Sequence, residues 1–170
     1  MRIETCSICG TKICHPFGHS DDLLIIVDAP TRLDIEKGQL FSTSHMFTTS
    51  GKVFRKELAR VGLELSQFRV VSLWEHEPSK VEECYLEGYH KVLDEAKGKK
   101  FIWLIGSEVV ETFTKYKVSD VSGLEVDSPV LSAPIIYAMV NPSMALARSL
   151  GEVRLSIEKV AKRLEQENLV

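Results

Sequence analysis

Cysteine and histidine side chains are concentrated near the start of the chain, and their types and spacing suggest metal chemistry. The residues concerned are Cys6, Cys9, Cys14, His15 and His19. Cys6 and Cys9 form a Cys-x-x-Cys pair, and a fourth cysteine, Cys84, stands alone far downstream. Thiolates and imidazoles are ligands of zinc, and thiolates also hold iron–sulfur clusters. The pattern therefore predicts a metal site, with a few reduced thiols in a loop as the alternative.

Two loops with a proline near their start are the second feature that suggests chemistry. The loop that begins at Asp28 follows the apolar run 23–27, and the loop that begins at Asn141 follows the apolar run 135–140. Proline ends a β ladder because it lacks a backbone donor and fixes φ. Open α/β sheets place their sites at the carboxyl ends of strands. We therefore expect the two loops to face one cleft, and we take that cleft as the candidate site.

Apolar runs alternate with helical patterns, and these elements must position the loops. Strands are expected at 23–27, 68–74, 101–105 and 135–140, and helices at 51–62, 79–96, 106–116 and 151–166. Residues 31–50 are expected to form a long polar loop, and residues 119–133 an irregular segment. The alternation predicts an α/β fold, a three-layer α/β/α sandwich around a central four-stranded parallel sheet. Residues 1–22 form a cysteine-containing segment and residues 23–166 the α/β domain, in one domain overall.

Composition excludes several classes of protein. The chain has 170 residues, of which 44% are hydrophobic and 26% charged, as in ordinary globular domains. The net charge of −3 means that any nucleic-acid contact must come from a local basic patch. There is no apolar run of the roughly 20 residues that a membrane span needs, and no export signal. We therefore expect an intracellular monomer with reduced thiols that is neither secreted nor membrane-bound.

The order of these landmarks carries a resemblance. A Cys-x-x-Cys pair precedes a first strand that ends in Asp28-Ala29-Pro30, Gly38 to Phe41 follows, and Cys84 opens a later helix. The segment from Asn141 to Arg148 closes the series. From Leu23 to about Arg148 the chain resembles the uracil-DNA glycosylase superfamily, most closely its iron–sulfur-containing family 4 branch. That branch has Gly-Glu-Ala-Pro-Gly, Gly-x-Pro-Phe, a third cysteine and His-Pro-x-x-Leu-x-Arg in the same order.

The resemblance implies a DNA glycosylase, a hydrolase that removes uracil or another deaminated base in base-excision repair. Asp28, in place of the family's glutamate, would orient the water, and Asn141, in place of its histidine, would donate to the leaving base. The residues implied to bind the flipped base are Ala29, Pro30, Phe41, Phe47 and Ser72. Those implied to contact DNA are Ser143, Met144, Leu146 and Arg148. Phe41, Phe47, Met144 and Leu146 have packing in the core as their alternative role.

The resemblance also implies a [4Fe–4S] cluster. The family's fourth cysteine would fall near Lys99, where this chain has none, so Cys14 completes a set with Cys6, Cys9 and Cys84. The alternatives are a zinc ion, with His15 or His19 replacing a thiolate, or no metal. Two further histidines, His45 and His76, are expected to be surface or loop residues.

A second function stays open beside the enzyme. Serine cannot make the bidentate amide contact of the family's base-reading asparagine, and Ser72 stands at that position. The alternative is therefore a catalytically silent protein with a glycosylase fold that binds DNA, single- or double-stranded, or a replication or repair protein.

Overall fold

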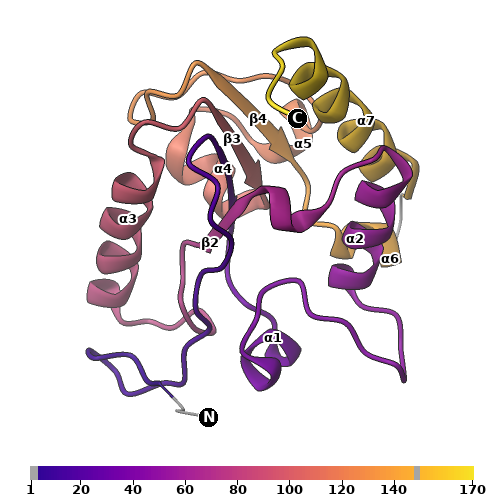
Figure 1. Ribbon diagram of the computed structural model, residues 1–170. Coiled ribbons are helices and arrows are strands. Elements are labelled where there is room, and N and C mark those ends of the chain that lie inside the picture. The colour runs from indigo at the N-terminus through magenta and orange to yellow at the C-terminus, as the bar shows by residue number, and fades with distance from the viewer. Residues whose placement is uncertain (1–3, 148–149) are drawn as a thin grey trace.

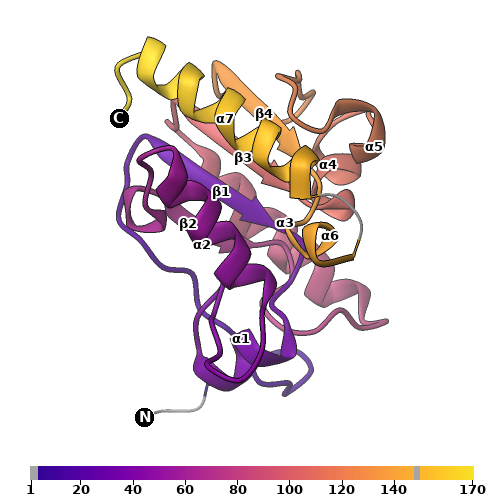
Figure 2. The same cartoon turned by 90° about the vertical axis from the view of Figure 1, so that its right-hand side faces the viewer.

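Four apolar runs form the strands of one sheet in the computed structural model, which describes residues 4–147 and 150–170. The strands are β1 (Leu23–Val27), β2 (Arg69–Ser72), β3 (Phe101–Ile105) and β4 (Ile135–Met139). All neighbouring strands are parallel, in the order β2-β1-β3-β4 (Figures 1 and 2). β1, β3 and β4 are buried along their whole length, because helices cover both faces of the sheet. The predicted four-stranded parallel sheet is confirmed.

Helices form a layer on each side of this sheet. They are α1 (Arg32–Lys37), α2 (Ser50–Arg60), α3 (Glu82–Ala96), α4 (Ser107–Phe113), α5 (Val118–Val121), α6 (Ser143–Ala147) and α7 (Leu150–Gln166), with a 3-10 turn at Leu65–Gln67. Alternate side chains of a strand point to opposite faces. Ile25 packs with α2 and α7, whereas Ile26 packs with α3, α4 and α5. Figures 1 and 2 show the two layers, and the predicted α/β/α sandwich is confirmed.

The register of the sheet brings all four carboxyl ends to one edge. Val27 is level with Ser72 on one side and Ile105 on the other, and Ile105 is level with Met139. The loops after β1 and β4 therefore lie at the same edge, but β3 runs between them. Two strand spacings separate their backbones by roughly 10 Å.

The long loop expected at 31–50 contains a helix, α1. Thr31 and Asp34 form a reciprocal capping box: Asp34 N–H donates to Thr31 Oγ1 (3.2 Å), and Thr31 N–H donates to Asp34 Oδ2 (3.0 Å). Asp34 is buried and also accepts from the backbone N–H of Ser42 (2.9 Å), which holds the following turn against the helix. Two smaller differences are α5, inside the segment expected to be irregular, and α3, which begins at Glu82 rather than near 79.

The N-terminal segment runs along the outer edge of β2. Phe17 N–H donates to the carbonyl of Val70 (3.1 Å), and Val70 N–H donates to the carbonyl of Phe17 (2.8 Å), in antiparallel pairing. Cys14 N–H donates to the carbonyl of Glu75 (2.7 Å), just beyond the strand. The pairing covers an edge that would otherwise expose unpaired backbone groups. No helix in the described ranges combines the length and the apolar character that crossing a membrane requires.

Candidate functional site

Three cysteines and one histidine, from the N-terminal turn, the loop after β2 and the start of α3, converge on one point. The ligand atoms of Cys6, Cys9, His76 and Cys84 all lie within 4.8 Å of one another. Cys6 Sγ is 3.8 Å from Cys84 Sγ, and Cys9 Sγ is 3.4 Å from His76 Nε2. The group could hold a metal ion, and it contains three of the four cysteines predicted as ligands.

Local backbone geometry presents each ligand. A tight turn holds the first two cysteines: Cys6 N–H donates to the carbonyl of Thr11 (2.7 Å), and Gly10, at φ 74°, donates to the carbonyl of Cys6 (2.9 Å). His76 Nδ1 lies 2.7 Å from the carbonyl oxygen of Glu77. A carbonyl only accepts, so Nδ1 carries the proton and Nε2 keeps its lone pair for a metal.

Cys84 reaches the group because α3 packs unusually close to the chain after β2. A Cβ built on Gly88, one turn beyond Cys84, would lie 1.9 Å from the carbonyl oxygen of Leu73. Only glycine permits this approach, which brings Cys84 beside the loop of His76.

Gly88→Ala is expected to push α3 away from Leu73, to weaken metal binding at least 10-fold and to destabilise the fold by about 2 kcal/mol. Metal titration and urea unfolding would measure the two effects. Gly151→Ala is the matched control, because a Cβ at that helical glycine meets nothing within 4 Å. Equal behaviour of the two variants would contradict the role of Gly88.

The thiols of the group differ in acidity. Hydrogen bonding with the side chain and backbone of Thr11 lowers the pKa of Cys9 to about 6, whereas burial raises the pKa of Cys84 to about 12. Three thiolates so close together repel one another. A bound cation would offset this repulsion and deprotonate the remaining thiols, as metal ions do to coordinating cysteines.

The structure does not bring Cys14 into this group, contrary to the four-cysteine set. Its main chain lies beside Glu75, but its side chain is fully buried in the core on the α2 side of the sheet. Burial also raises the pKa of its thiol to about 12. Of the two histidines considered as substitutes, His15 pairs with Glu4 (2.7 Å) and His19 is exposed.

His76 is the site residue that the sequence did not single out. We expected a surface or loop residue, and His76 does lie in a loop. Its side chain is only 2% exposed, however, so it is not on the surface. The available signal was its place just after a strand, at the edge where parallel sheets gather their sites.

Asp28 is used in the structure to cap α4. Its Oδ1 accepts from the backbone N–H of Val109 (2.8 Å), and Glu108 N–H also bonds to the carboxylate. The side chain rests on Gly106, where a Cβ would be 2.4 Å from Oδ2. Burial raises the pKa of Asp28, and the nearby carboxylates of Glu108 and Glu111 add to the rise against the effect of the two N–H donors.

Asp28→Asn is expected to keep the cap and leave stability at pH 7 unchanged or slightly higher, while Asp28→Ala costs about 1 kcal/mol. Because the pKa is raised in the folded state, the wild type gains stability as pH falls through that pKa towards about 3.9, and the Asn variant lacks this gain. Urea unfolding at pH 7 and pH 5 would measure the difference. A wild type that loses stability relative to Asp28→Asn on acidification would contradict the raised pKa.

Trp74 links the loop of Asp28 to the metal group. Its indole N–H donates to Glu108 Oε1 (3.0 Å), and its ring centroid lies 5.9 Å from that of His76. Trp74 therefore contacts both the first turn of α4, which Asp28 caps, and the metal group.

Asn141 is arranged differently from Asp28. Its Oδ1 accepts from the N–H of Ser143 (2.9 Å) and so starts α6. Within the described part of the chain, its amide nitrogen donates no hydrogen bond, so this group is available to a ligand.

The residues expected to bind a flipped base are spread over several places. Pro30 is buried, Ala29 packs with the α3 side of the core, and Phe41 packs against Phe54 with ring centroids 4.6 Å apart and the rings tilted by 33°. Phe47, by contrast, is 59% exposed. Ser72 is buried at the end of β2 and lines a cavity at the sheet edge. Phe41 therefore takes the core role that was its alternative.

Among the residues expected to contact DNA, those on α6 are exposed. Ser143 lies on the surface, and Met144 and Leu146 expose 38% and 48% of their side-chain surface. Arg148 lies outside the described residues.

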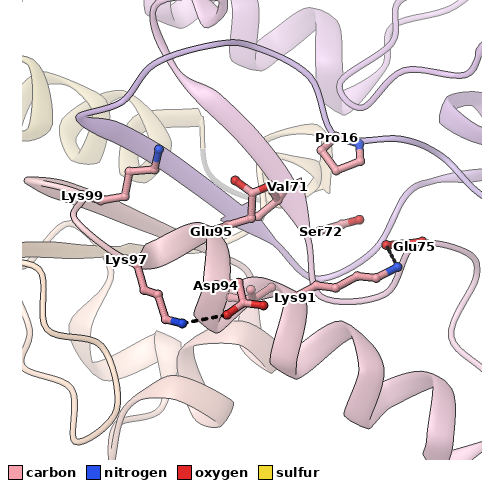
Figure 3. Close-up of a pocket in the computed structure, with 10 residues that line it drawn as sticks. Pro16, Val71, Ser72, Glu75, Lys91, Asp94, Glu95, Lys97 and Lys99 are labelled. Atoms are coloured by element: carbon pink, nitrogen blue, oxygen red, sulfur yellow. Dashed lines mark hydrogen bonds and ion pairs between the residues drawn. The ribbon is translucent and has the colours of Figure 1, made fainter.

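The cavity beside Ser72 measures about 470 Å³ and lies between β2, α3 and the N-terminal segment (Figure 3). Most of its charged side chains form ion pairs: Lys91 with Glu75 (2.7 Å), Lys97 with Asp94 (3.0 Å) and Glu95 with Arg69 (2.8 Å). Lys99 instead donates to the carbonyl oxygen of Ser20 (2.8 Å) and forms no ion pair with a described residue. Neither Asp28 nor Asn141 lines it.

Comparison with known proteins adds no family to this description. No family model matches the chain, and no curated protein matches it either. The fold and the geometry define an α/β/α sandwich protein with a group of three cysteines and one histidine that could hold a metal ion.

Proposed function

We propose that this protein binds nucleic acid through α2 and does not excise bases. The observation that carries this proposal is a basic stripe on the exposed side of α2, formed by Lys52, Lys56 and Arg60. The only carboxylate of the helix, Glu57, is 3% exposed and already bound by Arg60 (2.9 Å) and Arg154 (3.0 Å). In a chain of net charge −3, the stripe is the local basic patch that phosphate binding requires.

The three cations of the stripe destabilise α2 when it is considered as an isolated helix. Like charges at i and i+4 repel by about 0.2–0.5 kcal/mol per pair. Lys52 also lies in the first turn of α2, which has no acidic residue and where the helix dipole disfavours cations. An anionic partner that runs along the stripe would offset both effects.

The neighbourhood of α2 suits a nucleic-acid surface. α6, with exposed Met144 and Leu146, packs against α2, and both helices face the viewer in Figure 2. Met46 is 90% exposed in the segment that leads into α2. Exposed apolar side chains beside cations are the groups that contact bases and insert between them. By contrast, the segment 75–87, around the metal group, carries five glutamates and one lysine.

The hydrogen bonds of Asp28 favour binding without excision. A carboxylate that orients an attacking water must point into the base pocket, whereas Asp28 accepts two backbone N–H groups of α4. Excision of a deaminated base, the reaction implied by the glycosylase resemblance, remains the second candidate. The observation in its favour is the amide nitrogen of Asn141, which donates no hydrogen bond within the ranges that the structure describes.

We further propose that the metal is zinc. A zinc tetrahedron with bonds of about 2.3 Å to sulfur and about 2.0 Å to nitrogen has edges of about 3.8 Å between sulfurs and about 3.6 Å between sulfur and nitrogen. The separations of 3.8 Å and 3.4 Å in the group match a single ion. A [4Fe–4S] cube places one iron under each ligand and spreads the ligands further apart, and it normally takes four thiolates. Three cysteines and one histidine are a common set for structural zinc.

One experiment separates the two functions. Fluorescence anisotropy would measure binding of single- and double-stranded oligonucleotides, and alkali treatment would reveal excision from the same strands carrying uracil, hypoxanthine or xanthine. Binding without cleavage is the expected result. Cleavage that is lost in both Asp28→Asn and Asn141→Ala, with binding retained, would establish the second candidate. Wild-type protein that neither binds nor cleaves would overturn both.

A further inference from the structure

A cavity of about 350 Å³ opens between α1 and the start of α2, and neither Asp28 nor Asn141 lines it. Its lining includes two large apolar side chains, Leu33 and Phe47, and the polar side chains of Arg32, Glu36 and Ser50. The volume lies at the lower end of the range of small-ligand sites, which suits one planar ring system.

The apolar side chains suit an aromatic ligand. Phe47 keeps 59% of its side chain exposed, although Phe41, six residues earlier, is buried against Phe54. An exposed phenyl ring beside an aliphatic side chain is the kind of surface on which unstacked bases bind.

The polar side chains define which base fits. Within the described ranges, neither the hydroxyl of Ser50 nor the carboxylate of Glu36 has a hydrogen bond or an ion pair. A carboxylate accepts from an exocyclic amino group, such as that of cytosine, and repels the carbonyl oxygen that thymine carries at the same place. Cytosine and adenine therefore fit this lining better than thymine or uracil.

The cavity is continuous with the basic stripe. Ser50 is the first residue of α2, and Lys52 follows half a turn later. Lys52, Lys56 and Arg60 recur about every 6 Å along the helix axis, a repeat that suits the phosphates of an extended strand. A strand that places one base in the cavity would thus continue along the stripe.

We infer that this cavity is a subsite for one unstacked base with an exocyclic amino group, cytosine or adenine, held between Phe47 and Leu33 and read by Glu36. The inference rests on the proposed nucleic-acid binding and names the part of the surface that selects the base. It needs no excision, and its preferred bases differ from uracil.

The test compares an all-thymine single strand with strands that carry one central cytosine or adenine. Wild-type protein is expected to bind the substituted strands at least 5-fold more tightly. Phe47→Ala should weaken their binding by about 10-fold or more, and Phe47→Tyr should retain it. Glu36→Gln should remove the preference for cytosine, with binding of the all-thymine strand unchanged or tighter because the repulsion of its carbonyl oxygen is lost. Val130→Ala, a change at an exposed apolar side chain outside the lining and outside α2 and α6, should have no effect.

Phe47→Trp provides a direct readout, because the native Trp74 and Trp103 are buried. Emission from the introduced ring should be quenched by the cytosine strand more than by the all-thymine strand. If Phe47→Ala binds every strand as the wild type does, the subsite is wrong although nucleic-acid binding stands. Equal or tighter binding of the all-thymine strand would overturn the base selection, and failure of the wild type to bind any strand would overturn both proposals.

Discussion

Replacing His76 with alanine is expected to abolish metal retention and to lower the free energy of unfolding by about 3 kcal/mol in the presence of zinc. The imidazole is buried and is the fourth of the four side chains that could hold the ion, so its loss opens the group to water. A metal that binds only the folded state stabilises it by about 3 kcal/mol at a hundredfold excess over its Kd. The group lies where the N-terminal turn, the loop after β2 and α3 meet. Without the metal, these three segments are no longer cross-linked to one another.

Metal content after dialysis and urea unfolding, each with and without a chelator, would measure this effect. The chelator should destabilise the wild type and leave His76→Ala unchanged. His15→Ala is the matched control, because it removes an exposed imidazole outside the group. Loss of the metal in Cys14→Ala with retention in His76→Ala would restore the four-cysteine set. Iron and sulfide in the purified protein, with visible absorption, would overturn zinc.

The sheet could be predicted because its strands are buried on both faces. Such strands read as unbroken apolar runs, and Leu23–Val27 and Phe101–Ile105 are two of them. α1 was missed because its six residues show no clear apolar period, and its capping box uses Asp34 where the usual pattern has glutamate or glutamine.

The metal group could be predicted only in part because it joins segments that are distant in sequence. The Cys-x-x-Cys pair is visible in the sequence, but His76 is 67 residues from Cys9. Cys14 lies near the same loop through its backbone bond to Glu75, yet its side chain points into the core. Which face a side chain takes along an extended segment depends on register, and the spacing of cysteines does not contain that information.

The double substitution Lys52→Glu with Lys56→Glu is expected to weaken nucleic-acid binding by about 10- to 100-fold. Each phosphate contact contributes about 0.9 to the slope of log K against log salt on duplex DNA, so the slope should fall by about 1.8. Affinity would be measured by anisotropy over a range of salt concentrations.

The folded state should not suffer from this change. Both lysines are exposed, and a glutamate in the first turn of α2 is favoured by the helix dipole. Unchanged or slightly higher stability with lost binding would therefore locate the contact on the stripe. The matched control is Lys97→Glu with Lys100→Glu, an equal change of charge at lysines that are 79% and 61% exposed and paired with Asp94 and Asp22. If the control weakens binding as much as the stripe variant, the effect is one of net charge, and α2 is not the contact surface. If only the stripe variant loses affinity, the stripe is the contact surface. Binding of an anionic partner then explains why α2 carries three cations that destabilise it as an isolated helix.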